Sequence, residues 1–195
     1  MRTVASFAFL AALSTSLWAM PPVPRKAPEF TIAEPSGKQT LLTSCRGKVV
    51  VLEFMFTTCP HCQAESQVLT KLHSELGAKG FQPLAVAFND NASLLVSDFQ
   101  HKFHPSYPIG VAPRESVVSY LGLPTDEGTR WVVPQIVVID RKGMIVAQSA
   151  PDGTPDLQDE TKLRALIERL LKEGATPAKA TPSKVTKATG KNSGL

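Results

Sequence analysis

The sequence predicts an α/β fold in which a mixed β-sheet is flanked by helices. Residues 49–54 and 81–88 are apolar runs of strand length with almost no polar alternation, which is typical of strands buried on both faces. Residues 60–76 lie between them and carry apolar side chains at helical spacing. The three segments therefore predict a strand–helix–strand crossover with parallel strands. Residues 135–140 and 144–148, joined by a short polar turn, add an antiparallel hairpin.

The remaining elements follow from local patterns. Residues 30–32 and 40–42 flank a turn-forming cluster that contains Pro, Ser and Gly, which predicts an N-terminal β-hairpin. Residues 20–28 form a proline-rich lead-in that is expected to be extended. Three further helices are predicted from apolar residues at helical spacing: one between Asn91 and His104, one over 115–121 and one over 159–172. The apolar face of the first is assigned to Leu94, Leu95, Phe99 and Phe103. Residues 106–113 show no such period and are expected to be irregular.

The chain of 195 residues fits one domain with appendages. Residues 1–19 begin with Arg2, continue as an apolar stretch and end at Ala19 after small and polar residues, a pattern typical of a cleaved signal peptide. An uncleaved segment that anchors the chain in a membrane is the alternative. In either case the folded domain, residues 29–173, is expected in the periplasm or another extracytoplasmic compartment, where disulfides form and are exchanged.

The C-terminal segment, residues 174–195, differs in composition from the domain. It contains no aromatic or acidic residue, and its lysines carry the whole net charge of +4. Such a segment cannot bury enough apolar surface to fold, so we expect a disordered basic tail. No basic patch with interleaved aromatic residues predicts nucleic-acid binding. Membrane contact is expected only through this tail or an uncleaved signal segment.

The candidate chemistry lies in the motif Cys-Pro-His-Cys at residues 59–62, where the first long strand leads into its helix. Pro60 is well accommodated in a first helical turn, which places Cys59 at the helix N-terminus and Cys62 one turn inside. Free backbone N–H groups and the helix dipole favour a thiolate there, and a protonated His61 would stabilise it further. Cys59 is therefore predicted to attack a disulfide and Cys62 to resolve the mixed disulfide.

Two other roles for this motif are weaker. A zinc site needs four ligands, commonly two Cys-X-X-Cys pairs, whereas this chain has one pair, the isolated Cys45 and four histidines. A purely structural disulfide between Cys59 and Cys62 would close a loop too small to stabilise the fold much. A redox-active pair is preferred, and no metal or organic cofactor is expected. Cys45 has no evident partner and is interpreted as a bystander thiol rather than a third redox group.

From about residue 27 to residue 172 the chain resembles the TlpA/ResA-like thiol–disulfide oxidoreductases of the thioredoxin superfamily. Besides the cysteine motif, four short segments carry the resemblance: Ala-Pro-Glu-Phe at 27–30, Gly-Lys-Val-Val-Val-Leu at 47–52, Val-Pro at 133–134 and Ile-Asp-Arg-Lys-Gly at 139–143. The resemblance implies a thioredoxin-like fold in which the Val133–Pro134 peptide is cis, faces Cys59 and docks a client chain. It also implies client proteins with thiols or disulfides, a dithiol redox partner, and a reducing role such as support of cytochrome c maturation.

Departures from the family pattern leave the direction of electron flow open. Residues 55–58 are Met-Phe-Thr-Thr where the family usually has Trp-Ala-Thr/Ser-Trp, so the surface around Cys59 lacks the flanking indoles. Pro60 and His61 match the dipeptide of strongly oxidising DsbA-type enzymes, so a disulfide-forming oxidant is the alternative to the favoured reductant. A thiol peroxidase is disfavoured because Phe56 replaces the threonine of peroxiredoxins. A copper- or haem-delivery module is disfavoured because Sco-type copper carriers space their cysteines differently.

Two carboxyl groups and one tryptophan complete the predicted site. Glu53 lies six residues before the first cysteine, where thioredoxins have a buried aspartate, and Glu65 matches a glutamate that TlpA/ResA-like proteins keep near the active site. Burial raises the pKa of a carboxyl, and either group could take the proton of Cys62 as that thiol attacks. The alternatives are that Glu53 pairs with a lysine and that Glu65 faces solvent. Trp131 is assigned to the client groove, with core packing as the alternative.

Overall fold

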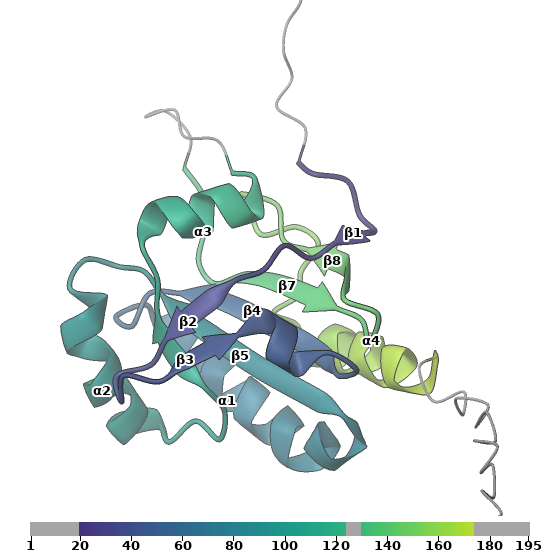
Figure 1. Cartoon of the computed structure of the whole chain (residues 1–195), viewed down its shortest axis with the longest axis horizontal. Helices are drawn as coiled ribbons and strands as arrows, with labels where there is room; N and C mark the ends of the chain where they lie inside the picture. The colour runs from purple at the N-terminus through teal and green to yellow at the C-terminus, as the bar shows by residue number, and fades with distance from the viewer. Residues whose placement is uncertain (1–19, 124–129, 174–195) are drawn as a thin grey trace, which may run out of the picture.

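The computed structural model describes residues 20–123 and 130–173. The signal segment predicted at 1–19 and the tail predicted at 174–195 lie outside the described residues. Within the described part of the chain, no helix combines the length and the apolar character needed to cross a bilayer. The described residues form one mixed eight-stranded sheet with helices on both faces (Figure 1).

The predicted crossover unit forms the centre of the sheet. β4 (Val49–Met55) and β5 (Phe81–Ala87) run parallel, with Val49 opposite Phe81 and Met55 opposite Ala87. α1 (Pro60–Leu76) connects the two strands. Every residue of β4 is buried, which confirms that its unalternating run marks a strand covered on both faces.

The predicted C-terminal hairpin extends the sheet on the other side of β4. β7 (Gln135–Ile139) pairs antiparallel with β4, and β8 (Met144–Gln148) pairs antiparallel with β7. β1 (Arg25–Lys26) belongs to the proline-rich lead-in and pairs with β8, where the Ala27 N–H donates to the Gly143 carbonyl at 2.9 Å. The lead-in therefore covers an edge of the sheet that would otherwise be open to pairing.

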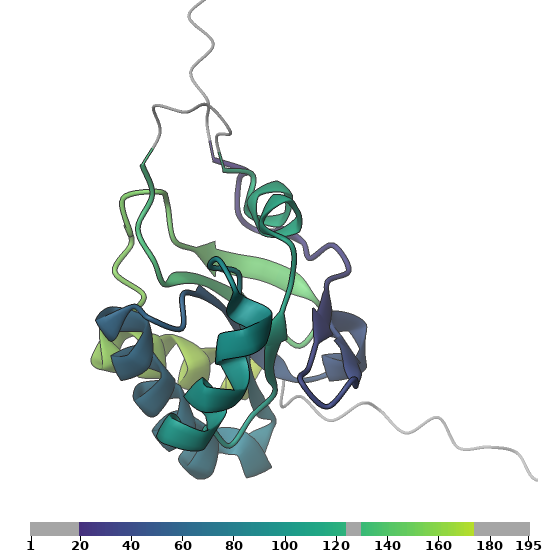
Figure 2. The same cartoon turned by 90° about the vertical axis from the view of Figure 1, so that its left-hand side faces the viewer.

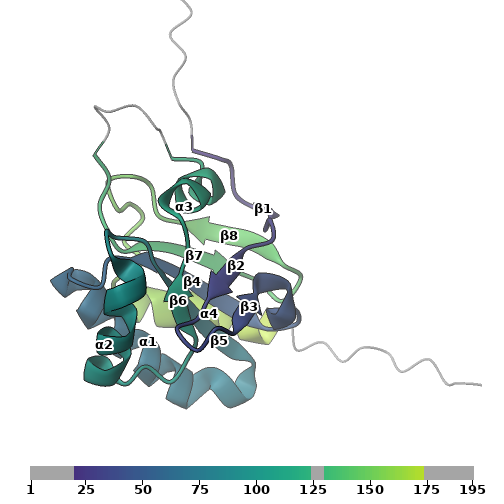
Figure 3. The same cartoon turned by 60° about the vertical axis from the view of Figure 1, so that its left-hand side comes forward.

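The opposite edge contains a strand that the sequence did not predict. β6 (Ile109–Val111) pairs parallel with β5 and antiparallel with β2 (Thr31–Ala33), which forms the predicted N-terminal hairpin with β3 (Gln39–Leu41) (Figure 3). The expectation of irregular structure was wrong here because three residues are too few to show a period. A Cβ on Gly110 would lie 2.4 Å from the Ala33 carbonyl oxygen, so glycine permits this close pairing. The strand order is β1-β8-β7-β4-β5-β6-β2-β3.

Alternate residues of β4 face two apolar cores. The odd-numbered residues point towards a core that is closed by α1, α2 (Ala92–Phe103) and α4 (Glu160–Glu173). The even-numbered residues point towards a second core, closed by α3 (Arg114–Leu121) and the N-terminal hairpin. Figure 2 shows α3 on one side of the sheet and the other helices on the opposite side. Glu53 therefore shares the face of β4 that α1 covers.

One residue of the predicted apolar face of α2 is misassigned. Leu94 is 74% exposed, whereas Ala92, Val96 and Phe99 are buried. These three positions follow the spacing of one helical stripe, and Leu94 lies off that stripe.

Candidate active site

The two cysteines lie where β4 leads into α1. Cys59 occupies the N-cap position of α1 with extended backbone angles (φ −81°, ψ 122°), and Pro60 is the first helical residue, as predicted. Cys59 is half-buried, whereas Cys62, one turn further along, is fully buried. Neither cysteine forms a disulfide in this structure. An accessible sulfur at a helix N-terminus with a second sulfur inside the helix is the arrangement that disulfide exchange requires.

Hydrogen bonds that the sequence did not reveal hold the loop between β4 and α1. The Cys59 N–H donates to the Phe56 carbonyl at 3.1 Å, and the Gln63 side-chain amide donates to the Thr57 carbonyl at 3.0 Å. The Thr57 N–H donates to Oδ1 of Asn89, which follows β5, at 2.9 Å. The carboxyl ends of neighbouring parallel strands meet at one edge of the sheet. The position of Asn89 just after the second strand could therefore have predicted that it lies near this loop.

The Val133–Pro134 peptide is cis and faces the first cysteine, as the resemblance implied. The Val133 carbonyl oxygen lies 3.7 Å from the Cys59 sulfur, which is within reach of an S–H···O hydrogen bond. The Gln135 side-chain amide holds this loop by donating to the Val132 carbonyl at 2.8 Å. The peptide thus borders the surface beside the reactive sulfur.

Trp131 takes part in both of the arrangements considered for it. Its ring stacks on Phe88, with centroids 5.3 Å apart and an interplanar angle of 12°. Its half-buried side chain also lines an open pocket together with Phe56, Arg114 and Arg130. Packing against the core on one side therefore leaves the indole available for client contact on the other.

Glu53 is a buried carboxyl without a partner. Its side chain is fully buried, and neither carboxyl oxygen has a hydrogen-bond partner among the described residues. Burial raises the pKa of Glu53 well above its usual range, and Glu65 and Cys59 raise it further. Burial without a partner therefore favours the protonated form of this carboxyl. The ion pairs of residues 20–123 and 130–173 do not include Glu53, so the alternative of a lysine partner is wrong.

Glu65 lies on the inward side of α1. It is 3% exposed, so the alternative of a solvent-facing side chain is wrong. Burial, and then the negative charges of Asp156 and Glu160, raise the pKa of Glu65 to about 8. A carboxyl with this pKa is mostly protonated at neutral pH and ionises just above it, a range suited to proton transfer.

Cys62 belongs to a buried group of polar side chains that also contains the two glutamates. Burial and then Glu53 raise the pKa of the Cys62 thiol, and a hydrogen bond from the Phe56 backbone opposes part of that effect. Sequence reasoning missed Ser66 and Tyr107, whose buried hydroxyl groups also lack partners among the described residues. Burial and then Glu53 raise the pKa of Tyr107, and the neighbouring Ser66 hydroxyl opposes part of that effect. Unpartnered buried polar groups are costly and rare, and here they are concentrated beside a thiol.

The remaining predicted residues lie at the edge of the site or outside it. His61 is exposed in the first turn of α1, next to Cys59. Cys45 ends a short 3₁₀ helix (Leu42–Cys45) that precedes β4, so a seven-residue strand of about 23 Å separates it from Cys59. The structure does not bring Cys45 to the redox pair. Within the described ranges, no group of three or more His, Cys, Asp or Glu side chains could hold a metal ion.

Comparison with known proteins places this geometry in a family. The Redoxin family matches residues 22–167. The thiol-disulfide oxidoreductase ResA of Geobacillus thermodenitrificans is 28% identical over 152 residues, which cover 74% of this chain and 83% of that protein. ResA of Bacillus anthracis is 24% identical over 132 residues, which cover 68% of this chain and 72% of that protein.

Solved structures agree on the fold. A thiol:disulfide interchange protein of the thioredoxin family from Chlorobium tepidum matches with a TM-score of 0.62 at 22% identity, covering 77% of this chain and 99% of that one. The thioredoxin domain of a thiol-disulfide oxidoreductase from Bacteroides vulgatus matches with a TM-score of 0.60 at 18% identity, covering 75% of this chain and 99% of that one. The thioredoxin-like fold implied by the resemblance is thereby confirmed. Because the family match spans most of the chain and includes both cysteines, this protein belongs to the Redoxin family, as a TlpA/ResA-like member of the thioredoxin superfamily.

Proposed function

We propose that this protein is an exported thiol–disulfide oxidoreductase that reduces disulfides in client proteins and is regenerated by a dithiol redox partner. One observation carries the proposal. Cys59 is accessible at the start of α1 with the Val133 carbonyl 3.7 Å from its sulfur, while Cys62 is buried one helical turn away. Relatives that are named thiol-disulfide oxidoreductases support the same activity.

In the first half-reaction, the Cys59 sulfur attacks one sulfur of a client disulfide. A bond forms between Cys59 and the client, the client S–S bond breaks, and the departing client sulfur takes up a proton. The start of α1 has no side-chain cap, so its free N–H groups and helix dipole stabilise the attacking thiolate. The client backbone lies along Val133, and the half-buried Trp131 borders the same surface, whereas Pro134 is buried.

In the second half-reaction, Cys62 attacks the Cys59 sulfur and expels the reduced client. The Cys62 thiol must first lose its proton, and burial opposes that loss by raising its pKa. Glu53 raises the pKa of Cys62, and Glu65 in turn raises the pKa of Glu53, so the three groups form a series. The ionised form of Glu53 or Glu65 takes the Cys62 proton as that thiol attacks.

Reduction is favoured over oxidation by the resemblance to ResA proteins, with support of cytochrome c maturation as the role that this resemblance suggests. The oxidant alternative is based on Pro60 and His61, and His61 is exposed beside the reactive cysteine. Export to the periplasm or another extracytoplasmic compartment is supported by the signal-peptide pattern of residues 1–19.

The reduction potential of the Cys59–Cys62 couple tests the direction. The protein is equilibrated with dithiothreitol or glutathione buffers, and its free thiols are counted after acid quenching. A reductant is expected near the thioredoxin value of about −270 mV, whereas a value near about −120 mV would assign the oxidant role. The reduced protein should also release thiols from a disulfide-bonded test protein such as insulin. Failure to do so at any pH from 6 to 9 would contradict the proposed activity.

A further inference from the structure

Beside Cys59 lies a surface that the mechanism above does not explain, in which an arginine is stacked on aromatic rings. Arg114 is the first residue of α3, and its guanidinium carbon lies 4.8 Å from the ring centroid of Trp131 and 5.9 Å from that of Phe88. Phe56 meets Phe88 edge-on with centroids 4.7 Å apart. We call these four residues, Phe56, Phe88, Arg114 and Trp131, the Arg114 shelf.

The Arg114 shelf is connected to the reactive cysteine on two sides. Phe56 accepts a hydrogen bond from the Cys59 N–H at 3.1 Å through its carbonyl. Trp131 lies two residues before Val133, whose carbonyl is 3.7 Å from the Cys59 sulfur. Three shelf residues and Arg130 line an open pocket of about 330 Å³. A client held by Cys59 would therefore pass this pocket.

Arg114 differs from most arginines among the described residues in what its side chain contacts. Four arginines bond to partners within the fold: Arg25, Arg141, Arg164 and Arg169. Arg114 instead is exposed and rests against ring faces, and no hydrogen bond or ion pair joins its side chain to another described residue. Stacking restricts the guanidinium plane without using its in-plane N–H donors, so the two parallel donors at the edge of the guanidinium, its fork, are held in an ordered plane.

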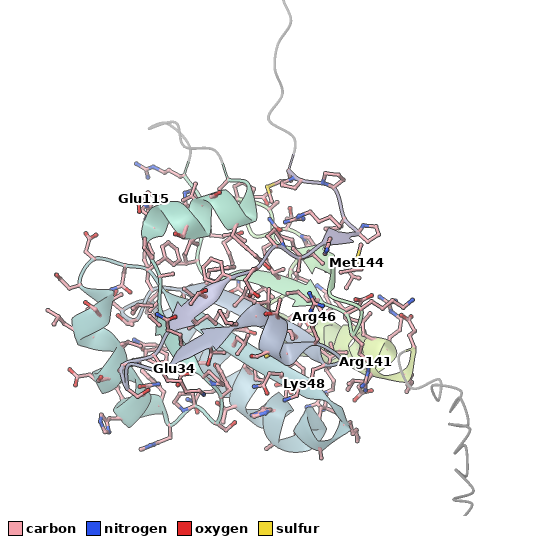
Figure 4. All side chains as sticks on the ribbon, viewed as in Figure 1. Glu34, Arg46, Lys48, Glu115, Arg141 and Met144 are labelled. Atoms are coloured by element: carbon pink, nitrogen blue, oxygen red, sulfur yellow. The ribbon has the colours of Figure 1, made fainter. Side chains whose placement is uncertain are left out.

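A carboxylate is the group that fits this fork. Two parallel N–H donors match the two oxygens of a carboxylate, and a bidentate pair of this kind is stronger than a neutral hydrogen bond. Arg130 adds a second positive charge at the same pocket, and the start of α3 contributes the positive end of its dipole without a side-chain cap. Glu115, labelled at the start of α3 in Figure 4, is the next residue and points about 100° away around the helix.

We propose that the Arg114 shelf is a specificity site for client polypeptides that carry an aspartate or glutamate close to their reactive cysteine. This inference rests on the oxidoreductase function proposed above. The guanidinium binds the client carboxylate, and the exposed aromatic surface of Phe56 and Trp131 contacts the apolar residues beside it. Binding precedes the exchange, in which the client disulfide gains two electrons and the Cys59–Cys62 dithiol becomes a disulfide.

Two disulfide-linked peptides test this specificity. They are identical except that Asp and Glu flank the cysteine in one and Asn and Gln in the other. The pre-reduced full-length protein is mixed with each under single-turnover conditions, and every rate constant is divided by that for dithiothreitol to correct for intrinsic reactivity. We expect the acidic peptide to react about fivefold to tenfold faster at low ionic strength. In Arg114→Gln this ratio should fall close to one.

Two variants and one change of salt concentration test the origin of the effect. Arg46 is an exposed arginine at the opposite end of β4, where Figure 4 labels it with Lys48 and Arg141, and Arg46→Gln should leave the ratio unchanged. High salt should lower the ratio in the native protein, a measurement that does not depend on any variant folding. Arg114→Lys keeps the charge but loses the planar fork, so an intermediate ratio is expected.

The outcomes distinguish the two proposals. A native protein that reduces both peptides equally, or an Arg114→Gln variant that keeps the full ratio, overturns the acidic-client specificity and leaves the oxidoreductase function standing. Reduction of neither peptide by the native protein overturns the proposed function itself.

Discussion

The two ends of β4 carry cysteines in opposite surroundings. At the amino end, beside Cys45, the backbone groups are paired. The Lys48 N–H donates to the Cys45 carbonyl at 3.1 Å, and Arg141 donates to the carbonyls of Gly47 at 3.0 Å and Lys79 at 2.7 Å. At the carboxyl end, the buried carboxyl and hydroxyl groups around Cys62 lack partners among the described residues.

This difference shows how position on a parallel strand decides what a thiol can do. A helix begins at the carboxyl end of β4, and its free N–H groups are available to the Cys59 sulfur. The amino end has no such helix start, and its backbone carbonyls are bound by the two terminal nitrogens of Arg141, whose Nε alone is buried without a partner among the described residues. Polar groups left unpartnered cost stability, so one end of the strand contributes to folding and the other to chemistry.

The sharpest test of this comparison is removal of a thiol at each end. Cys59→Ser should lower the rate of client disulfide reduction by about a thousandfold or more, because a hydroxyl is not ionised near neutral pH. Cys45→Ala removes a buried thiol at the other end and should leave the rate within about twofold, with a small loss of stability. Thiol release from insulin measures both. A large loss of activity in Cys45→Ala would contradict its assignment as a bystander.

The buried carboxyls should produce the next largest effect. Glu53→Gln and Glu65→Gln are each expected to slow release of the mixed disulfide by about tenfold to a hundredfold, because the Cys62 proton loses an acceptor. In the native protein this rate should rise with pH and level off above about 8, where Glu65 is ionised, and Glu65→Gln should remove that rise. Stopped-flow quenching of the mixed disulfide gives the rate. Unchanged release in both variants would exclude the proposed series.

The same carboxyl predicts how stability depends on pH. The pKa of Glu65 is about 8 in the folded protein against 4.5 as its ordinary value, so the folded state holds a proton that the unfolded state loses between these values. Stability therefore falls as pH rises from about 4.5 to 8, by up to about 5 kcal/mol from this group. The free energy of unfolding of Glu65→Gln, measured with urea and compared with that of the native protein, should be higher at pH 8 than the same comparison gives at pH 5. If the difference in free energy of unfolding between the variant and the native protein does not change with pH, the raised pKa of Glu65 is contradicted.

The smallest effect on exchange is expected at the amino end. Arg141→Ala removes two hydrogen bonds to backbone carbonyls and should lower the free energy of unfolding by about 1–3 kcal/mol. The rate of insulin reduction should be unchanged, because the length of β4 lies between Arg141 and Cys59. If Arg141→Ala also lowers the rate of insulin reduction, the amino and carboxyl ends of β4 are energetically coupled.

Much of the fold could be predicted because its signals are local. The apolar run of β4, the proline at the start of α1 and the turn between β7 and β8 each lie within a few residues of the element they define. β6 was missed because it exists through pairing with β5 and β2, and its three residues carry no period of their own. Leu94 was misassigned because sequence spacing alone does not say which stripe of α2 faces the core.

The site divides in the same way. Cys59, Cys62, Glu53 and Glu65 were named from the sequence because they belong to one continuous strand–helix segment. The sequence did not point to Ser66 and Tyr107, which belong to the buried polar group around Cys62. It also did not point to Asn89, which binds the loop between β4 and α1. For Tyr107 the sequence offered no signal, since its hydroxyl reaches the buried carboxyls only through packing of a segment that has no regular structure.

The sequence by itself determined that an accessible cysteine follows a buried strand at a helix N-terminus, because strand, proline and helix are encoded within about 30 neighbouring residues. Only the tertiary structure decided what surrounds that sulfur. The cis peptide at Val133–Pro134, the burial of Glu65 and the stacking of Arg114 on Trp131 join residues that are far apart in the chain. Such contacts depend on how the sheet and its helices pack, and no local pattern records them.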